Sequence, residues 1–407
     1  MQKITAQIFW LSLLCGCISI FYFLSLAIGL PVIVTTLLII IASFFLYRKM
    51  MQWLVKPEVE AEPMPPKALY ILLGSIVLFC IFEIFLSRKY GDWDSITIWN
   101  FHALFLRDPE HWKRIFLYTE YAHSDYPLLT SGTTAFFWRL FYPAMPGLVP
   151  FTLTAMFCTL VPVLIYLELY KKNLQLATLT LLVFLSNSYY LNCGIVQYAD
   201  IDLSFFLLGA FVAINYYKKE AKPAYILLCG MMLGSCLWTK NEGIMIAAIF
   251  GLFYFRTFTK GKNLVYFLAG IAPFILGVAI LKLVYAPAND LIDGQHKVAW
   301  QNILDKERYK LIFGYISDKL NERFSAIKIG LILYVLDCVF RQRFPAKNLL
   351  MLFVIMGGYI LVYIYTPHDL EWHLKTSVDR LILQLVPAAV YIMSLDLSSL
   401  RLKTVEQ

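Results

Sequence analysis

Long apolar runs recur along the whole sequence, and they constrain the fold more than any other feature. The chain has 407 residues, of which 60% are hydrophobic and only 15% are charged. A run of about 18 or more apolar residues is long enough to cross a hydrocarbon core of roughly 30 Å as a helix. Because the backbone inside lipid must satisfy its own hydrogen bonds, such runs fold as helices. The sequence therefore predicts an all-α protein that crosses a membrane several times.

The runs predict about twelve membrane-spanning helices. They lie near residues 8–29, 31–47, 68–86, 149–169, 175–192, 203–217, 223–238, 243–256, 264–285, 324–340, 348–366 and 380–396. The first is longer than the apolar core of a signal peptide, so we expect it to remain as an anchor. A charged, Pro-rich stretch follows the second span and predicts a linker. The chain thus divides into an N-terminal two-helix membrane segment (1–47), a cytoplasmic linker (48–67) and a transmembrane body (68–399).

Basic residues set the predicted orientation. Lysine and arginine occur in alternate short connections, at 48–56, 171–172, 218–222, 256–262, 341–347 and 401–403. Short basic connections stay in the cytoplasm, and these fall on one side of a twelve-span arrangement that begins with Lys3 inside. The exterior side then receives the long loops 87–148, 286–323 and 367–379. These loops, with the two short connections YADID (198–202) and TKNEG (239–243), hold nearly all the motif-like polar residues.

The first exterior loop opens with the acidic and aromatic stretch YGDWDSITIWNFH (90–102). From residue 94 to residue 116, apolar and aromatic residues recur at three- and four-residue spacing, which predicts one or two amphipathic helices along the membrane surface. Asp92 and Asp94 stand where the third span ends. A carboxylate in a partly apolar, tryptophan-lined pocket is a usable general base. The alternative is an ordinary hydrated helix cap, a position that aspartate favours.

Two further motifs carry carboxylates on the same side. In YAHSDYPLL (121–129), His123 and Asp125 lie two residues apart and share one face of an extended segment, with Tyr126 beside them. In YADID (198–202), Asp200 and Asp202 stand at the entrance to the sixth span. Both motifs are candidates for a binding site. Turn chemistry at Pro127 and an N-cap pair on a membrane helix are the respective structural alternatives.

The remaining motifs combine acids with bases. WTKNEG (238–243) places Lys240 and Glu242 between two apolar runs, where charges are costly and usually mark a site. Lys240 suits a phosphate contact, and a Lys–Glu pair that neutralises itself is the alternative. Before the last span, the segment 366–387 contains His373 and Arg380. Arg380 suits bidentate phosphate binding or an interfacial snorkelling role, and the histidine spacing there fits no usual zinc signature.

Several function classes are disfavoured. The sequence contains no GxxxxGK[ST] phosphate loop and no G-x-S-x-G at a helix start, so ATP hydrolysis and serine-hydrolase chemistry have no support. The basic residues form no patch interleaved with aromatic residues, which disfavours nucleic-acid binding. The two D-x-D strings, at 92–94 and 200–202, keep a divalent cation possible.

Taken together, the motifs resemble those of the bacterial GT-C glycosyltransferases, the group that includes protein O-mannosyltransferases and the lipid A aminoarabinose transferase. The resemblance covers most of residues 85–390. It depends on the order and shared exterior placement of GDWDSITIW, HSDYPLL, YADID, WTKNEG and WHLKTSVDR. In the mannosyltransferases the first motif is an adjacent Asp-Glu pair, whereas here Trp93 separates the two acids.

The resemblance implies a GT-C-like transmembrane bundle in a bacterial inner membrane, with its active site facing the periplasm. Such enzymes transfer a sugar from a polyprenyl-phosphate carrier, with inversion, to an envelope glycan, lipid or protein, and they need no cofactor. Asp94 would be the general base and Asp92 its support or substitute. The substrate-binding residues would be His123, Asp125, Tyr126, Asp200, Lys240, Glu242, His373 and Arg380, with Lys240 and Arg380 on the lipid phosphate.

Two other functions remain open. A multi-span transporter or lipid flippase would also place charges in a twelve-span chain, although its charges belong near the midplane and its halves show symmetry. A GT-C-like ligase or polymerase would transfer a whole glycan, and it predicts a large arginine-rich exterior loop.

Overall fold

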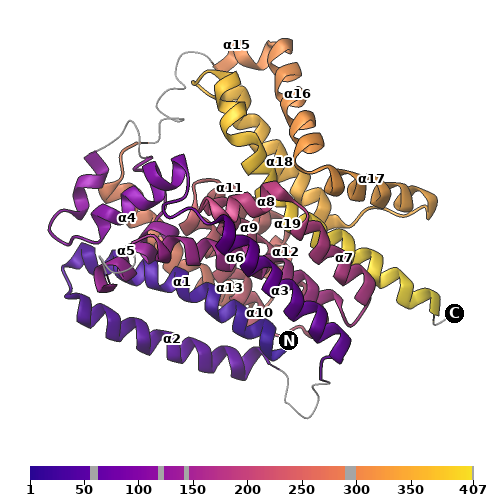
Figure 1. The fold of residues 1–407 in the computed structure, drawn as a ribbon, viewed down its shortest axis with the longest axis horizontal. Helices are drawn as coiled ribbons and strands as arrows, with labels where there is room; N and C mark the ends of the chain where they lie inside the picture. Colours follow the sequence, from indigo (N-terminus) through magenta and orange to yellow (C-terminus); the bar gives the residue numbers. More distant parts are fainter. Residues whose placement is uncertain (56–62, 118–122, 142–145, 289–298, 406–407) are drawn as a thin grey trace. The chain divides into compact units, whose positions relative to one another are not determined.

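The structure, a computed structural model, describes residues 1–55, 63–117, 123–141, 146–288 and 299–405 (Figure 1). Every regular element in these ranges is a helix, which confirms the predicted all-α class. The elements are α1 (Lys3–Ile28), α2 (Val32–Leu54), α3 (Pro66–Leu86), η2 (Ser95–Trp99), α4 (Asn100–Leu106), η3 (Trp112–Leu117), α5 (Leu129–Phe141), α6 (Leu148–Leu169), α7 (Leu174–Leu185), α8 (Ser188–Ile195), α9 (Ala199–Glu220), α10 (Pro223–Thr239), α11 (Glu242–Phe253), α12 (Phe255–Phe258), α13 (Asn263–Ile280), η4 (Leu281–Tyr285), α15 (Ala299–Leu304), α16 (Lys306–Glu322), α17 (Ser325–Phe340), α18 (Lys347–Tyr365) and α19 (Leu370–Val405). Part of the predicted linker and parts of the first two long loops lie outside the described residues.

Within the described residues, eight helices are long and apolar enough to cross a membrane. They are α1, α2, α3, α6, α9, α13 continued by η4, α18 and most of α19. Helices α7 and α8 meet the same criterion as a pair bent by 63°, which would make nine. The chain is therefore a multi-pass membrane protein.

Each of the twelve predicted spans coincides with a helix or a broken helix. Three of these helices are short, however: α10, α11 and α17 contain 17, 12 and 16 residues. A straight helix needs about 20 residues to cross a bilayer. The number twelve therefore remains a prediction, and so does the orientation derived from it.

Two compact units make up the chain, and each is described by itself. The first comprises Met1–Leu164 and Asn192–Pro287, and the second comprises Ile165–Leu191 and Ala288–Gln407. In the first unit, α1 packs against α2 and α5 and also contacts α10 and α13 (Figure 1). Helix α1 is thus a packed element of the first unit, and α2 continues through Leu54 into the segment predicted as a linker.

Helix α9 forms the interior of the first unit, since every residue from Ala199 to Ile214 is buried. It packs against α10, which in turn packs against α13. The second contact is made by backbone atoms. A Cβ atom at Gly230 of α10 would lie 2.6 Å from the carbonyl oxygen of Phe267, and one at Gly270 of α13 would lie 2.3 Å from that of Leu227. Small residues of this kind let membrane helices approach closely.

Helix α5 is an element that the sequence did not predict. Its first residues, LTSGTT, are mostly hydroxyl-bearing and have low helix propensity. In the structure, two hydrogen bonds join this segment to the neighbouring helix α1. The Ser19 hydroxyl donates to the carbonyl of Leu128 at 2.6 Å, and the Thr133 hydroxyl donates to that of Cys15 at 2.9 Å. These tertiary hydrogen bonds stabilise a helix that local propensity disfavours.

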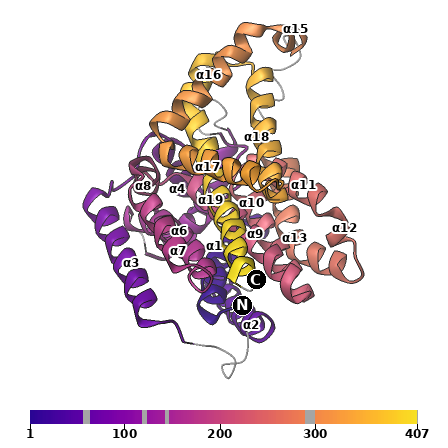
Figure 2. The same cartoon turned by 90° about the vertical axis from the view of Figure 1, so that its right-hand side faces the viewer.

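In the second unit, α19 packs against α16, α17 and α18 (Figure 2). Asp305 caps the N-terminus of α16, because its side chain accepts from the backbone N–H of Glu307 at 3.0 Å. Arg308 on α16 donates to the carbonyl of Tyr363 at 2.8 Å, at the end of α18. The predicted exterior loop 286–323 therefore contains a polar helix fastened to the unit's interior.

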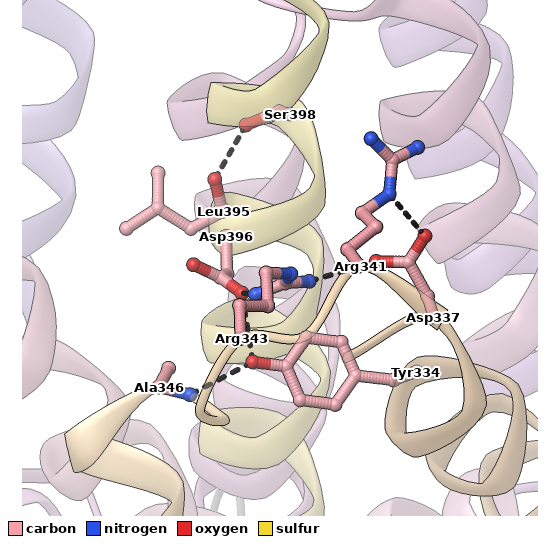
Figure 3. A network of polar contacts seen from close by, with 8 residues as sticks. All are labelled: Tyr334, Asp337, Arg341, Arg343, Ala346, Leu395, Asp396 and Ser398. Atoms are coloured by element: carbon pink, nitrogen blue, oxygen red, sulfur yellow. Dashed lines mark hydrogen bonds and ion pairs between the residues drawn. The ribbon is translucent and has the colours of Figure 1, made fainter. Parts of the chain in front are cut away.

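A polar network joins the α17–α18 connection to α19 (Figure 3). Arg343 pairs with Asp396 on α19 and with Asp337 on α17, the latter at 2.9 Å. The Tyr334 hydroxyl donates to Asp396 at 2.7 Å and accepts from the backbone N–H of Ala346 at 2.8 Å. Because one arginine satisfies carboxylates from two helices, this connection is held in one conformation.

We expect Arg343→Met to destabilise the protein. The guanidinium is 19% exposed, and its removal leaves the half-buried Asp396 without its cation, so we expect a loss of about 1–3 kcal/mol in the free energy of unfolding. The measurement is thermal unfolding of the purified protein in detergent. Arg341→Met is the matched control, since Arg341 pairs with Asp337 alone and is 54% exposed. Equal losses in both variants would contradict the role assigned to Arg343.

Candidate functional site

Asp92 and Asp94 belong to the turn between α3 and η2, called the acidic turn below. Asp92 accepts a hydrogen bond from Arg88 at 2.8 Å and another from the backbone N–H of Trp93 at 2.8 Å. Asp94 precedes the π-helix η2 and is half-buried, whereas Trp93 is 72% exposed. Asp92 is thus occupied as a turn-forming carboxylate, while Asp94 stands at the start of the helix.

The acidic turn is fastened to the corner that precedes α9. Ser95 donates to the carbonyls of Val196 and Gln197, the second at 3.1 Å. Gln197, in a left-handed conformation with φ 62°, accepts from the Asn100 side chain at 3.2 Å and donates to the carbonyl of Arg88 at 2.9 Å. Residues about 100 positions apart in the sequence therefore form one rigid corner.

Gly91 allows this close approach. Its φ is +76°, and a Cβ atom there would lie 2.6 Å from the carbonyl oxygen of Val196. Only glycine adopts that conformation without strain and leaves space for the backbone opposite.

The second motif lies against the same corner. The His123 ring stacks on Tyr126 with centroids 4.8 Å apart, and the Tyr126 ring lies 5.7 Å from Trp99. Trp99 packs with Ile98 and with Ala199, the first residue of α9. Three aromatic rings from 99 to 126 therefore form a continuous stack beside the start of α9.

Asp125 joins this motif to α11 and η4. Its side chain is 6% exposed. One carboxylate oxygen accepts from the Asn241 amide at 2.7 Å and from the Lys282 ammonium at 3.0 Å. Lys282 also donates to the backbone carbonyl of Asp125. Asp125 is therefore the point where three segments of the first unit meet.

Lys240 stands in the break between α10 and α11 and bridges two carboxylates. Its ammonium lies 2.9 Å from Asp200 on α9 and 3.2 Å from Glu242 on α11, and its side chain is only 6% exposed. A buried ammonium that two carboxylates already neutralise has little charge to offer a phosphate. The Lys240–Glu242 pair is the self-neutralising arrangement that the sequence offered as the structural alternative. Asp200 adds a second carboxylate to that pair.

Asp202 lies one turn into α9 and is 1% exposed. One of its oxygens accepts from the Thr130 hydroxyl at 2.8 Å, and the other has no hydrogen-bond partner among the described residues. Asp200 and Asp202 thus lie in different surroundings, the first on Lys240 and the second on α5. The two acids have different hydrogen-bond partners, Lys240 and Thr130.

The last predicted motif belongs to the second unit. The His373 ring nitrogen lies 2.9 Å from the Thr366 hydroxyl, and the ring lies 4.9 Å from that of Tyr363. Arg380 is half-buried on α19. Because these residues belong to the other compact unit, their predicted role on the same phosphate as Lys240 remains a prediction.

The structure brings four of the five motifs together in the first unit, and it adds residues that the sequence analysis did not single out. Lys282 is the clearest omission, and its signal was present: it is a single charge in an otherwise apolar run from 264 to 285. Asn241, Gln197 and Thr130 were missed because their partners lie far away in the sequence. Among the described residues, no group of three metal-binding side chains converges.

No protein-family model, curated protein or solved structure matches this chain. The resemblance to GT-C glycosyltransferases therefore depends on the motifs alone, and function has to be argued from the site.

We expect Lys240→Met to be strongly destabilising, because it leaves Asp200 and Glu242 without a cation. Removal of one partner of a buried ion pair costs roughly 3–5 kcal/mol. The double variant Lys240→Met/Asp200→Asn removes the uncompensated charge as well and should recover part of this loss. Thermal unfolding of the wild type, both single variants and the double variant tests the coupling. Simple additivity of the two single effects would show that the pair is not coupled.

Proposed function

We propose that this chain is an integral-membrane glycosyltransferase that takes a sugar from a polyprenyl-phosphate carrier. The acceptor would be an envelope glycan, lipid or protein on the exterior face of a bacterial inner membrane. One observation carries the proposal: the acidic turn is fastened to the start of α9, beside the His123–Tyr126–Trp99 ring stack. The turn that bears the half-buried Asp94 and the ring stack are both held at the start of α9. This arrangement is suited to a lipid-borne sugar, whose reactive end lies at the membrane interface.

In this mechanism Asp94 is the base and Asp92 holds the turn. The acceptor hydroxyl loses its proton to the Asp94 carboxylate while its oxygen attacks the anomeric carbon of the sugar. The bond from that carbon to the phosphate oxygen breaks on the opposite side, so the anomeric centre inverts and polyprenyl phosphate leaves with the electron pair. Asp94 is assigned the proton because it directly precedes the S-I-T-I-W helix, as the general base does in the resemblance, whereas Asp92 bonds to Arg88 and to the backbone of Trp93.

The aromatic stack and the Asp125 junction have supporting roles in this proposal. The half-buried His123 ring, at the end of the stack, offers a face on which the C–H face of a sugar can lie, while Tyr126 supports that ring from between His123 and Trp99. The rings also exclude water from the reacting carbon. Asp125, Asn241 and Lys282 hold the segment that bears these rings to α11 and η4.

A transporter is the second candidate, and one observation favours it. Two carboxylates lie buried inside helices long enough to span the membrane: Asp202 in α9 and Glu83 in α3, at 1% and 3% exposure. Intramembrane carboxylates are common in proton and ion pathways. Neither residue takes part in the proposed sugar transfer. Substitution of Asp202 or Glu83 should therefore impair a transporter and leave a transferase active.

The first experiment follows the loss of sugar from a radiolabelled polyprenyl-phosphate sugar, with purified protein in nanodiscs and a membrane extract as the source of acceptor. We expect Asp94→Asn to lower turnover at least a hundredfold, because general-base catalysis contributes about 10²–10⁴, while binding of the lipid survives. Asp92→Asn is the matched control and should retain most of the activity.

Full turnover in Asp94→Asn would remove this residue as the base. No turnover in the wild type across several carrier-linked sugars, with solute or lipid movement that Asp202→Asn or Glu83→Gln abolishes in proteoliposomes, would favour the transporter instead.

A further inference from the structure

Two oxygen atoms at the start of α11 are buried without hydrogen-bond partners. Asn241 uses its amide N–H to bond Asp125, and its carbonyl oxygen Oδ1 has no partner among the described residues. Glu242 uses Oε1 to pair with Lys240, and its Oε2 is likewise without a partner. Such atoms cost about 1–3 kcal/mol each when they are left unsatisfied. The two residues are adjacent in the sequence, and each has one acceptor oxygen that lacks a donor among the described residues.

The charge around these atoms also selects for donors. Lys240 and Lys282 supply two positive charges, whereas Asp125, Asp200 and Glu242 supply three negative charges. Both ammonium groups are already directed at carboxylates, at 2.9 to 3.2 Å. These five side chains carry one more negative than positive charge, and together with two buried, unpaired acceptor oxygens they disfavour phosphate and favour hydroxyl groups or a cation.

We infer that Asn241 and Glu242 form the subsite that receives hydroxyl groups of the transferred sugar, and that the carrier phosphate lies outside this cluster. The inference depends on the proposed function and goes beyond it, because it assigns the two ends of the donor lipid to different places. Two sugar hydroxyl groups that reach these buried oxygens each donate one hydrogen bond and remove the cost of leaving the oxygens unsatisfied. This reverses the expectation that Lys240 holds the phosphate.

The subsite has a consequence for discrimination. A site built to accept hydrogen bonds from a hydroxyl rejects an analogue that lacks it, because its buried acceptors then stay unpaired. Asn241 and Glu242 therefore discriminate between sugars as well as adding affinity, whereas apolar contacts to the ring stack would tolerate either sugar.

Binding of two probes tests the assignment. The first probe is a polyprenyl phosphate without sugar, and the second is the same lipid that carries a hexose or pentose, taken from a small panel. We expect the wild type to bind at least one glycosylated lipid more tightly than the bare phosphate. Asn241→Leu and Glu242→Gln should each weaken the glycosylated lipid about tenfold, which corresponds to one lost hydrogen bond. The bare phosphate should bind them as it binds the wild type, which also shows that the variants are folded.

Glu322→Gln is the matched control, because Glu322 is an exposed residue of α16 that pairs only with Lys319 at 3.0 Å among the contacts described here. It should leave both probes unaffected. Equal weakening of both probes by Asn241→Leu and Glu242→Gln would overturn the assignment, since the cluster would then serve the phosphate or the fold. A preference for the glycosylated lipid that EDTA abolishes would also overturn it, in favour of a divalent cation on the two oxygens.

The outcomes separate this inference from the proposed function. If the wild type transfers sugar and depends on Asp94, but the two variants bind both probes normally, the subsite is wrong and the transferase stands. If the wild type binds neither lipid, both proposals fail together.

Discussion

The hydrocarbon interior of a membrane leaves backbone N–H and C=O groups nothing to bond except each other, and this constraint organises the whole chain. It makes every described regular element a helix. It also makes helix ends and breaks between helices the favoured places for charged groups, although Asp202 and Glu83 lie buried within α9 and α3. Lys240 lies in the break between α10 and α11, Asp200 at the start of α9, and Lys282 at the end of the α13–η4 run. The polar cluster is therefore a product of the same constraint as the fold.

The apolar runs were sufficient to predict the helical class and the positions of the long helices, because twenty apolar residues in lipid have one stable conformation. Helix α5 was beyond such reasoning. Its hydroxyl-rich start favours turns in isolation, whereas in the structure Thr133 donates to the Cys15 carbonyl of α1 and Thr130 donates to the carboxylate of Asp202. Likewise, the short helices α10 and α11 are each defined by a break at Lys240 that interrupts an apolar stretch.

The motifs predicted which segments carry the candidate site better than they predicted which residues pair with each other. Charges and aromatic residues near span ends predicted which segments would carry a site, and four of them do meet in the first unit. The pairings depend on tertiary contacts: Lys240 with Asp200, Asp125 with Asn241 and Lys282, and Ser95 with the corner at Gln197. A local pattern contains no record of a partner 40 to 157 positions away. The sequence therefore proposed Lys240 as a phosphate contact, whereas the structure surrounds it with acids.

The contact between Gly230 and Gly270 has an evolutionary consequence. Helices α10 and α13 are in contact through backbone atoms at these glycines. Side-chain substitutions elsewhere on the two helices leave this backbone contact in place. Lys240 directly follows the last residue of α10, ten positions after Gly230, so this contact helps to position the break that bears Lys240. Exposed residues of α13 can then be substituted in evolution without displacing the buried ammonium of Lys240. The exposed face of α13 tolerates substitution because Gly230 and Gly270 do not.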